Sequence, residues 1–294
     1  MNTQFNAASG SWAQSAGFTN AITSAVRPLY WSIRRELWEN RSIYFAPMAA
    51  AVIFLVGFAI SMIRMRIQNK VLWDQYELAP ALIMGAALIV SVFYCLDALY
   101  GERRDRSILF WKSLPVSDVT AVLAKLAIPI LVLPLLSFII TVAAQLLTLI
   151  MGSAILAGSG LNTHGLWANV SWFRVPAIWL YHLVTVHGLW YAPLYCWLLL
   201  VSAWAPRAPF LWAFLPPFVI YGVEKIAFNT SYFFNLMQYR LTGPGNGMDT
   251  EHQDFTATLI PHHFLSTPGL WSGLALAALF LFAAIRLRRS HGPI

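Results

Sequence analysis

Residues 97–125 read DALYGERRDRSILFWKSLPVSDVTAVLAK and form the densest run of charged side chains in the chain. On either side of this run lies an apolar segment long enough to cross a lipid bilayer. A charged run between two such segments is typical of a loop at the membrane surface. The sequence therefore predicts an all-α polytopic membrane protein.

The composition of the 294 residues also indicates a membrane protein. Hydrophobic residues make up 59% of the chain and charged residues only 11%, against roughly 25% charged in a soluble domain. A soluble globule of this composition would expose a large apolar surface. The net charge of +7 comes largely from Lys and Arg residues at the ends of apolar segments, where they are expected to contact lipid headgroups. We therefore expect the lipid bilayer as a partner and no nucleic acid.

The apolar segments predict six transmembrane helices in a domain of residues 27–289, with a polar tail of residues 1–26 before it and a short tail of residues 290–294 after it. The expected spans are about 43–63, 78–99, 119–150, 175–204, 210–228 and 264–285.

Prolines are expected to shape two of these spans. Pro129 and Pro134 should kink the third span, because each removes a backbone hydrogen-bond donor. The fifth apolar stretch is short for a full crossing and contains Pro216 and Pro217, so a broken or re-entrant element is expected there. Residues 226–267 are expected to form the largest loop outside the membrane.

An amphipathic helix is predicted just before the first span, beginning near Pro28. Apolar residues recur there at helical spacing, and Trp31, Arg34, Arg35 and Trp38 supply the aromatic and basic side chains typical of a helix in the membrane interface. The alternative is a solvated helix that only precedes the span.

Six spans place both ends of the chain on the same side of the membrane. Most Lys and Arg residues fall on that side, including those of residues 101–118 and the closing Arg286, Arg288 and Arg289. Because positively charged loops stay in the cytoplasm, both termini and the 101–118 loop are predicted to be cytoplasmic. We expect a multi-pass protein of a bacterial cytoplasmic (inner) membrane.

The 101–118 loop combines a charged turn with a short amphipathic helix. Glu102 and Arg103 begin the turn, and Ile108, Leu109 and Trp111 give the helix its apolar side chains. Such a compact element would fit a groove on a soluble partner. The alternative is a charged loop that only keeps this side of the membrane solvated.

This segment resembles the loop after the second span in permease subunits of type-2 ATP-binding-cassette (ABC) transporters. In that family a Glu-Arg pair closes the second helix, a Ser or Thr with apolar residues forms the coupling helix, and a Leu-Pro-[Ile/Val]-Ser turn leads into the third helix. The family often has Gly before the Ser or Thr, where this chain has Arg106. The matching residues here are Glu102 and Arg103, Ser107 with Ile108 and Leu109, and Leu114, Pro115, Val116 and Ser117.

The resemblance implies the transmembrane subunit of an ABC exporter, working as a homodimer or heterodimer and driven by a cytoplasmic ABC ATPase. No Gly-Lys dipeptide, and hence no P-loop, occurs in the sequence. ATP and Mg are therefore expected on the partner chain, with no cofactor and no enzymatic site on this one. The ATPase-coupling residues that the resemblance implies are Glu102, Arg103, Arg104, Asp105, Arg106, Ser107, Ile108, Leu109, Trp111, Leu114 and Pro115.

Polar residues inside the spans are candidates for a transport pathway. His182 and His187 share the fourth span, but five residues apart they would lie about 140° apart on an α-helix, a poor arrangement for binding one metal. Together with Gln145 in the third span, they could line a pathway or bond between helices. Cys95 and Cys196 lie in apolar runs and provide neither a disulfide framework nor a metal-binding spacing.

The outer 226–267 loop leaves other functions open. His262 and His263 occur there with Glu251, His252 and Asp254 nearby. These side chains could form a surface metal site, or they could be ordinary loop residues. The alternatives to a permease are therefore a membrane-embedded enzyme or a secondary transporter that uses these residues.

Overall fold

The computed structural model describes residues 27–64, 69–113, 116–158, 167, 174–243 and 264–290. These residues form helices joined by turns and irregular segments, and none of them lies in a strand. Five helices among them are long and apolar enough to cross a membrane, and a sixth crossing results if one bent pair counts as a single span. The expected all-helical, multi-pass membrane protein is confirmed for this part of the chain.

Within each described range, the helices follow one another with short connections. A helix over residues 27–39 comes first. It is followed by α2 Ser42–Arg64, α3 Asn69–Ala98, α4 Tyr100–Arg104, α5 Ser107–Ser113, α6 Asp118–Ala127, the π-helix η1 Ile128–Val132, α7 Leu133–Gly158, α9 Arg174–His182, the π-helix η2 Leu183–Trp190, α10 Ala192–Trp204, α11 Pro209–Phe228, α12 Tyr232–Thr242, the 3-10 turn η3 Phe264–Ser266 and α14 Pro268–Ser290.

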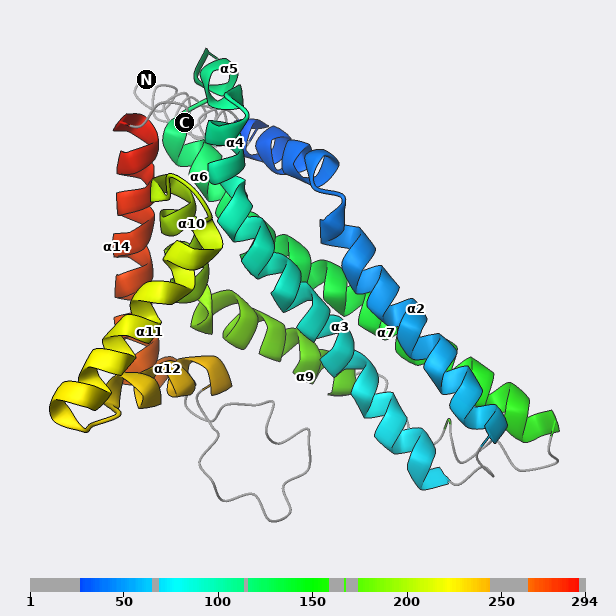
Figure 1. Ribbon diagram of the computed structural model, residues 1–294. Helices are drawn as coiled ribbons and strands as arrows, with labels where there is room; N and C mark the ends of the chain where they lie inside the picture. The colour runs from blue at the N-terminus through cyan, green and yellow to red at the C-terminus, as the bar shows by residue number, and fades with distance from the viewer. Residues whose placement is uncertain are drawn as a thin grey trace, which may run out of the picture.

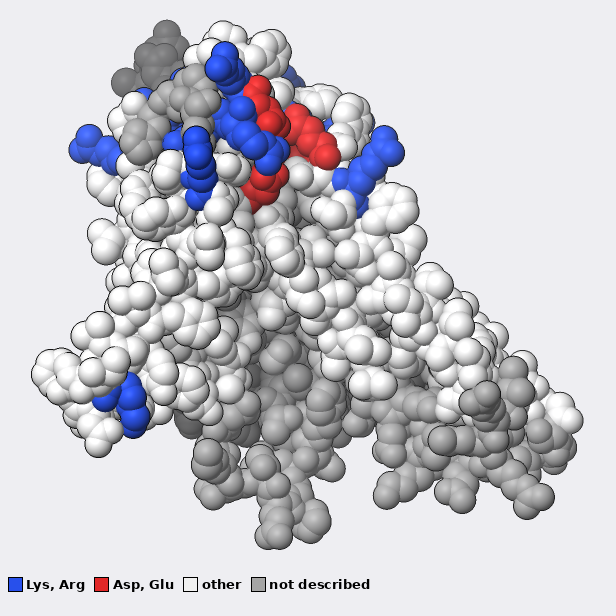
Figure 2. All heavy atoms as spheres, viewed as in Figure 1, with Lys and Arg blue, Asp and Glu red and all other residues white. Residues whose placement is uncertain are grey.

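Two groups of long helices lie close together at one end of the molecule and diverge away from it (Figure 1). One group contains α2, α3 and α7, and the other contains α10, α11 and α14, with α3 also packing on α10. The 27–39 helix, α4, α5 and the last turns of α14 gather at the narrow end. Most of the Lys, Arg, Asp and Glu side chains seen in this view lie there as well (Figure 2), and we call this the charged end.

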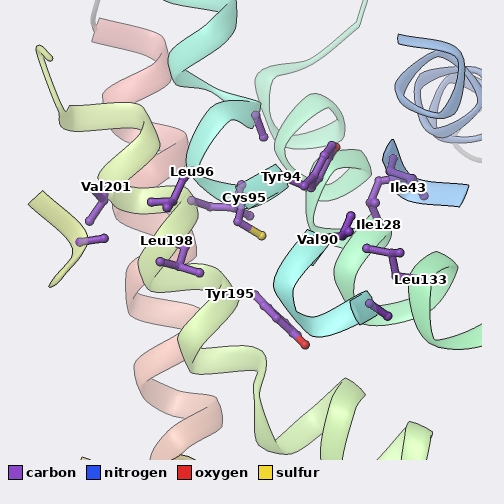
Figure 3. Close-up of a cluster of buried hydrophobic side chains, with 14 of the residues drawn as sticks. Ile43, Val90, Tyr94, Cys95, Leu96, Ile128, Leu133, Tyr195, Leu198 and Val201 are labelled. Carbon is purple, nitrogen blue, oxygen red and sulfur yellow. The ribbon is translucent and has the colours of Figure 1, made fainter. Parts of the chain in front are cut away.

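The main hydrophobic core lies beside the charged end, where α3, α10 and the η1 region meet (Figure 3). Cys95, Leu199 and Tyr195 are fully buried in it, and Ile128 and Leu133 reach it from either end of η1. The outer faces of the long helices carry exposed apolar side chains instead, for example Ile53 and Ile139. Exposed apolar faces of this extent are what a lipid-facing surface requires.

The limits of several spans differ from those expected. The third is one continuous helical stretch, Asp118–Gly158, in which the chain winds as a π-helix around Pro129, where a kink was expected. The fourth is the broken one: its two parts, 176–190 and 192–204, meet at an angle of 45°.

Helix α3 already begins at Asn69, inside the loop expected between the first two spans, and α12 occupies part of the expected outer loop. The last helix runs to Ser290 and includes the basic residues expected to end it.

The fifth span was expected to be broken, and this is wrong. Helix α11 runs for 20 residues through Pro216 and Pro217. Pro217 cannot donate a hydrogen bond to the carbonyl of Ala213, four residues earlier. That carbonyl instead accepts the indole N–H of Trp197 on α10, at 3.2 Å. A neighbouring helix thus satisfies the group that proline frees, and the helix continues.

Helix α12 docks against the start of α14, at the end of the molecule opposite the charged end. The Arg240 guanidinium donates to the carbonyl of Gly269 and stacks on the Trp190 ring, 4.5 Å from its centroid. The Trp190 indole in turn donates to the Arg240 carbonyl at 2.9 Å. A Cβ at position 273 would overlap the guanidinium, so the Arg240 side chain can keep this position only beside glycine.

Gly273→Ala is therefore expected to displace Arg240 from its two contacts. The free energy of unfolding in detergent should be about 1–3 kcal/mol lower than in Gly85→Ala. Gly85 is the matched control, because it too is helical but has nothing within 4 Å of an added Cβ. Equal unfolding free energies for the two variants would show that Arg240 does not hold α12 in place.

Candidate functional site at the charged end

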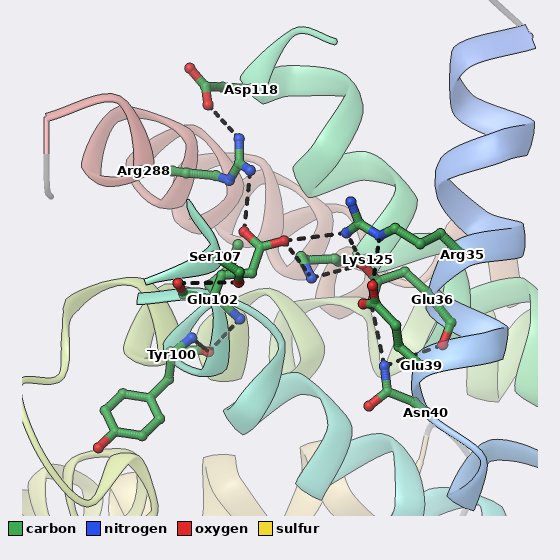
Figure 4. A network of polar contacts seen from close by, with 12 residues as sticks. Arg35, Glu36, Glu39, Asn40, Tyr100, Glu102, Ser107, Asp118, Lys125 and Arg288 are labelled. Atoms are coloured by element: carbon green, nitrogen blue, oxygen red, sulfur yellow. Dashed lines mark hydrogen bonds and ion pairs between the residues drawn. The ribbon is translucent and has the colours of Figure 1, made fainter. Parts of the chain in front are cut away.

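A buried network of charged side chains links four helices at the charged end (Figure 4). Its centre is the pair of carboxylates Glu36, from the 27–39 helix, and Glu102, from α4. Lys125 of α6 bridges them, with its Nζ 2.9 Å from Glu36 Oε1 and 3.2 Å from Glu102 Oε1. All three residues are at least nine-tenths buried. The network therefore ties the first helix, α4 and the third span to one another.

Arginines complete the network on both sides. Arg35 contacts both carboxylates, at 2.7 Å from Glu36 and 3.3 Å from Glu102. Arg288, near the end of α14, pairs with Glu102 at 3.2 Å and with Asp118 at the start of α6. Glu102 thus connects cations from the beginning, the middle and the end of the chain.

The charges of this network are balanced. Three cations (Arg35, Lys125 and Arg288) face three carboxylates (Glu36, Glu102 and Asp118). Burial by itself raises the pKa of a carboxyl group, but at Glu36 the charges of Lys125 and Arg35 outweigh burial, so that its pKa lies below the ordinary value of 4.5. Glu36 is therefore ionised at neutral pH, and its second oxygen accepts a hydrogen bond from the Tyr94 hydroxyl at 2.9 Å.

A second set of contacts fastens α4 to the end of α10. Arg103 is buried and donates to the carbonyls of Ala203 and Ala205, at 2.6 and 3.3 Å. These are among the carbonyls that the end of a helix leaves without a partner. In the other direction, the fully buried Ser202 hydroxyl accepts the backbone N–H groups of Leu99 and Tyr100, each at 2.9 Å. Helix α4 therefore has a fixed position relative to the fourth span.

Helix α5 follows α4 and exposes two of its apolar side chains. Its Ile108 is buried, whereas its Leu109 and Phe110 are 59% and 60% exposed. The Arg35 guanidinium lies over the Trp111 ring, 3.7 Å from its centroid, and joins α5 to the charged network. An anchored helix with two adjacent exposed apolar side chains is suited to contact another molecule.

The turn between α4 and α5 has a left-handed backbone at Arg106, with φ of 57°. This conformation costs a residue with a Cβ about 1–2 kcal/mol, and glycine avoids most of that cost. Arg106→Gly is therefore expected to raise the free energy of unfolding by about 1 kcal/mol. Thermal unfolding in detergent measures the change.

The control is Arg104→Gly, because Arg104 is the last residue of α4 and its φ is not positive. Glycine there should lower the free energy of unfolding by about 1 kcal/mol through its poor helix propensity. A loss of stability in both variants would contradict the assigned strain at Arg106.

The other predicted coupling residues are divided between surface and interior. The side chains of Arg104 and Asp105 are exposed and pair with each other at 2.9 Å. Ser107 is partly buried and donates to the Glu102 carbonyl at 3.5 Å. Leu114 and Pro115 lie outside the described residues. Only part of the predicted set can therefore touch a partner directly, while Glu102 and Arg103 face the interior of this chain.

The 27–39 helix presents its aromatic side chains outward. Trp31 and Trp38 are 58% and 68% exposed, and the Arg34 guanidinium lies between them, 5.2 and 4.9 Å from the two ring centroids. The opposite face carries Arg35 and Glu36 into the charged network. The exposed face has the side chains expected at a membrane interface.

The residues predicted to line a pathway lie elsewhere, within the long helices. His182 and His187 have ring centroids only 6.1 Å apart, which corrects the expectation that they point in different directions. The chain between them is π-helical, and in a π-helix residues five apart lie near one another. Gln145 is buried on α7, 4% exposed.

Metal-binding groups do not gather in the described part of the chain, where no three His, Cys, Asp or Glu side chains are placed to hold one metal ion. Cys95 and Cys196 are buried free thiols. The outer-loop candidates Glu251, His252, Asp254, His262 and His263 lie outside the described residues.

Sequence reasoning missed several residues of this site. Glu36 and Tyr94 were not singled out, and neither was Phe110 or Ser202. Arg288 was expected to mark the end of a span and instead bonds to Glu102. One signal was available: Lys125 stands alone among the apolar residues that open the third span, and a lone charge in such a position needs a buried partner.

Comparison of the chain with protein-family models, with curated proteins and with solved structures found no match.

Proposed function

We propose that this chain is the membrane-spanning subunit of an ATP-driven ABC exporter whose ATP is hydrolysed by a separate cytoplasmic chain. In this proposal the charged end is the cytoplasmic end, the 27–39 helix lies in the membrane interface, and α5 is the coupling helix. The subunit works as a dimer with a second copy or with a related subunit.

The structure of the 101–118 loop is the main support for this proposal. Its helix α5 exposes Leu109 and Phe110, while the residues beneath it are fixed by the buried charges of Glu102 and the hydrogen bonds of Arg103. A helix that receives force from a partner needs both features, an apolar contact surface and a rigid connection to the spans. A loop that only keeps the surface solvated needs neither of them.

The backbone at Arg106 supports the same reading. The family that this loop resembles often has glycine at this place, and Arg106 has the left-handed conformation that favours glycine. The departure in residue type is therefore compatible with the same turn geometry.

Force applied to α5 has a defined route into the membrane. Arg35 joins Trp111 of α5 to Glu36 and Glu102, and Lys125 carries the connection into the third span. ATP-driven movement of a partner would thus act on the first helix, α4 and α6 together. Packed interfaces of this kind respond by switching between discrete arrangements.

The direct test is purification of the tagged full-length chain from its native membranes in mild detergent. We expect a second chain with a G-x-x-x-x-G-K-[ST] loop to be retained, together with ATPase activity that vanadate inhibits. Intact, folded protein that retains no such chain and shows no ATP-dependent activity would contradict the proposal.

A further inference from the structure

A row of polar side chains is buried inside the third span, beyond the part of that span where Lys125 joins the charged network. Ser137, Thr141 and Gln145 follow one another at intervals of four residues along α7 and are 1%, 4% and 4% exposed. This spacing places them on one face of the helix. The same face carries Ala144, which packs on Ile83 of α3, so the row points into the protein and not toward lipid. We call these three residues the α7 polar row.

Each member of the α7 polar row has a polar atom without a hydrogen-bond partner: Ser137 Oγ, Thr141 Oγ1 and Gln145 Nε2. The Tyr195 hydroxyl of α10 is also unpaired, whereas other hydroxyls in the long helices are bonded. Thr148 and Thr185 donate to the carbonyl four residues earlier, at 2.8 and 2.7 Å. Leaving a buried polar group unpaired costs about 1–3 kcal/mol. Three such groups in succession therefore require an explanation beyond packing.

The end of the α7 polar row at Ser137 lies near the contact between the π-helices η1 and η2. Ser137, Ser91 and His187 line the same small space, together with Pro129 of η1 and Leu183 of η2. The space leaves no room for a water molecule, so in this arrangement no water satisfies the Ser137 hydroxyl. Separation of the surrounding helices would give the Ser137 hydroxyl access to water or to another partner.

The helices around the row have places where they can bend. The π-helices η1 and η2 pack against each other, and the backbone carbonyl of Ile130 lies 3.7 Å from the position of a Cβ on Gly188. The fourth span is already bent by 45° directly after η2. Single π-helical turns occur frequently at functional sites, and these two lie near the Ser137 end of the α7 polar row.

The α7 polar row is suited to an uncharged ligand. No Asp, Glu, Lys or Arg occurs in residues 42–63 of α2, 78–96 of α3 or 133–158 of α7. Hydroxyl and amide groups can exchange hydrogen bonds with a neutral polar group, whereas an ion would lose its hydration without gaining a counter-ion.

We infer that the α7 polar row lines the route of the transported molecule and contacts an uncharged, hydrogen-bonding part of it, such as a hydroxyl- or amide-bearing head group. The structure is then a closed arrangement, and opening between α7, α3 and η2 exposes the row. This inference rests on the proposed transport function and adds to it the chemical class of substrate.

Cysteine accessibility tests the inference in membranes that contain the full-length chain and its partners. Ser137→Cys and Thr141→Cys are treated with a neutral, membrane-impermeant, hydroxyl-bearing methanethiosulfonate, with ATP present or depleted. Ile139→Cys is the matched control on the same helix, because Ile139 is 57% exposed toward lipid. The unchanged chain measures the background from the buried Cys95 and Cys196.

With ATP present, the two row variants are expected to react at least about tenfold faster than the control. Rates no faster than the control under both conditions would overturn the inference. Fast reaction that is independent of ATP would support the row as a route and contradict the ATP-driven transporter, so the two proposals fail separately.

Charged reagents of matched size test the substrate class. After correction for reaction with free cysteine, anionic and cationic methanethiosulfonates should react at Ser137→Cys about tenfold more slowly than the neutral reagent. Equal corrected rates would overturn the assignment of an uncharged substrate group.

A pair of valine substitutions separates a transport role from a packing role. Thr141→Val removes an unpaired hydroxyl and is expected to leave stability unchanged or raised, while ATP hydrolysis by the purified complex falls several-fold. Thr148→Val removes a hydroxyl that is bonded to the Ala144 carbonyl, and should leave ATP hydrolysis unchanged. Equal ATP hydrolysis in the two variants would contradict the inference.

Discussion

Glu102→Ala is expected to lower the free energy of unfolding by about 3–5 kcal/mol, because the substitution leaves buried cations with too few carboxylates. Lys125, Arg288 and Arg35 all lie within 3.3 Å of Glu102 oxygens. Lys125 keeps Glu36, Arg288 keeps Asp118, and Arg35 keeps Glu36 and the half-exposed Glu39. The three cations of the network then share only two of its three carboxylates. Unfolding in detergent, followed by loss of helical signal, measures the effect.

The matched control is Glu39→Ala on the 27–39 helix. Glu39 pairs with Arg35 at 3.6 Å, but its side chain is 50% exposed. Water screens an exposed pair of this kind, so its loss should change stability by less than about 1 kcal/mol. Similar losses in Glu39→Ala and Glu102→Ala would show that the charges at Glu102 are solvated and do not hold the helices together.

A double substitution distinguishes loss of charge balance from loss of packing. Replacing Lys125 by Met alone leaves Glu36 and Glu102 with one cation fewer, and should also cost about 3–5 kcal/mol. Combining Lys125→Met with Glu36→Gln removes one charge of each sign and should recover a large part of this loss. Additive losses in the double variant would contradict the assignment of a coupled pair.

Replacing both Leu109 and Phe110 by Asp is expected to weaken binding of the ATPase partner at least about a hundredfold. Truncation of a central apolar anchor in an interface typically costs 2 kcal/mol or more, and every 1.4 kcal/mol is about tenfold in affinity. Both side chains are more than half exposed, so the folded chain loses little internal packing beyond the ring contact of Phe110 with Trp111. Partner retention during purification, measured against the amount of folded chain, gives the result.

Trp38→Ala is the control for this experiment, because Trp38 is also an exposed aromatic side chain at the charged end. It should leave partner binding unchanged if the 27–39 helix faces the membrane interface. Retention of the ATPase by the Leu109 and Phe110 variant would place the contact elsewhere. Loss of binding in Trp38→Ala alone would assign the contact to the first helix.

Glu102 is expected to have a different role from Leu109 and Phe110, although these residues are close in sequence. Loss of Glu102 should reduce coupling through loss of structure, whereas loss of Leu109 and Phe110 should reduce coupling with the fold intact. A decrease in stability would assign a residue to the folded framework, and a decrease in binding alone would assign it to the contact with the proposed partner.

The sequence by itself determined the class of fold. Long apolar segments must form helices in a bilayer, since only internal hydrogen bonds can satisfy the backbone there. Hydropathy therefore indicated the multi-pass character and approximate spans, and the charged residues of 97–125 indicated a surface loop between two of them. These features depend on local composition, which is fully visible in the sequence.

Only the tertiary structure decided which residues meet. Glu36 and Lys125 are 89 positions apart and Glu102 and Arg288 are 186 apart, and no local pattern relates them. The unbroken α11 depends on a hydrogen bond from Trp197 of another helix, and the closeness of His182 and His187 depends on a π-helical turn. In each case a partner distant in sequence, or a departure from regular helix geometry, outweighs the local preference. Residues 97–125 show the same effect. Their charged side chains Glu102 and Arg103 indicate a surface loop, but in the folded chain both side chains are buried. Leu109 and Phe110 are exposed instead.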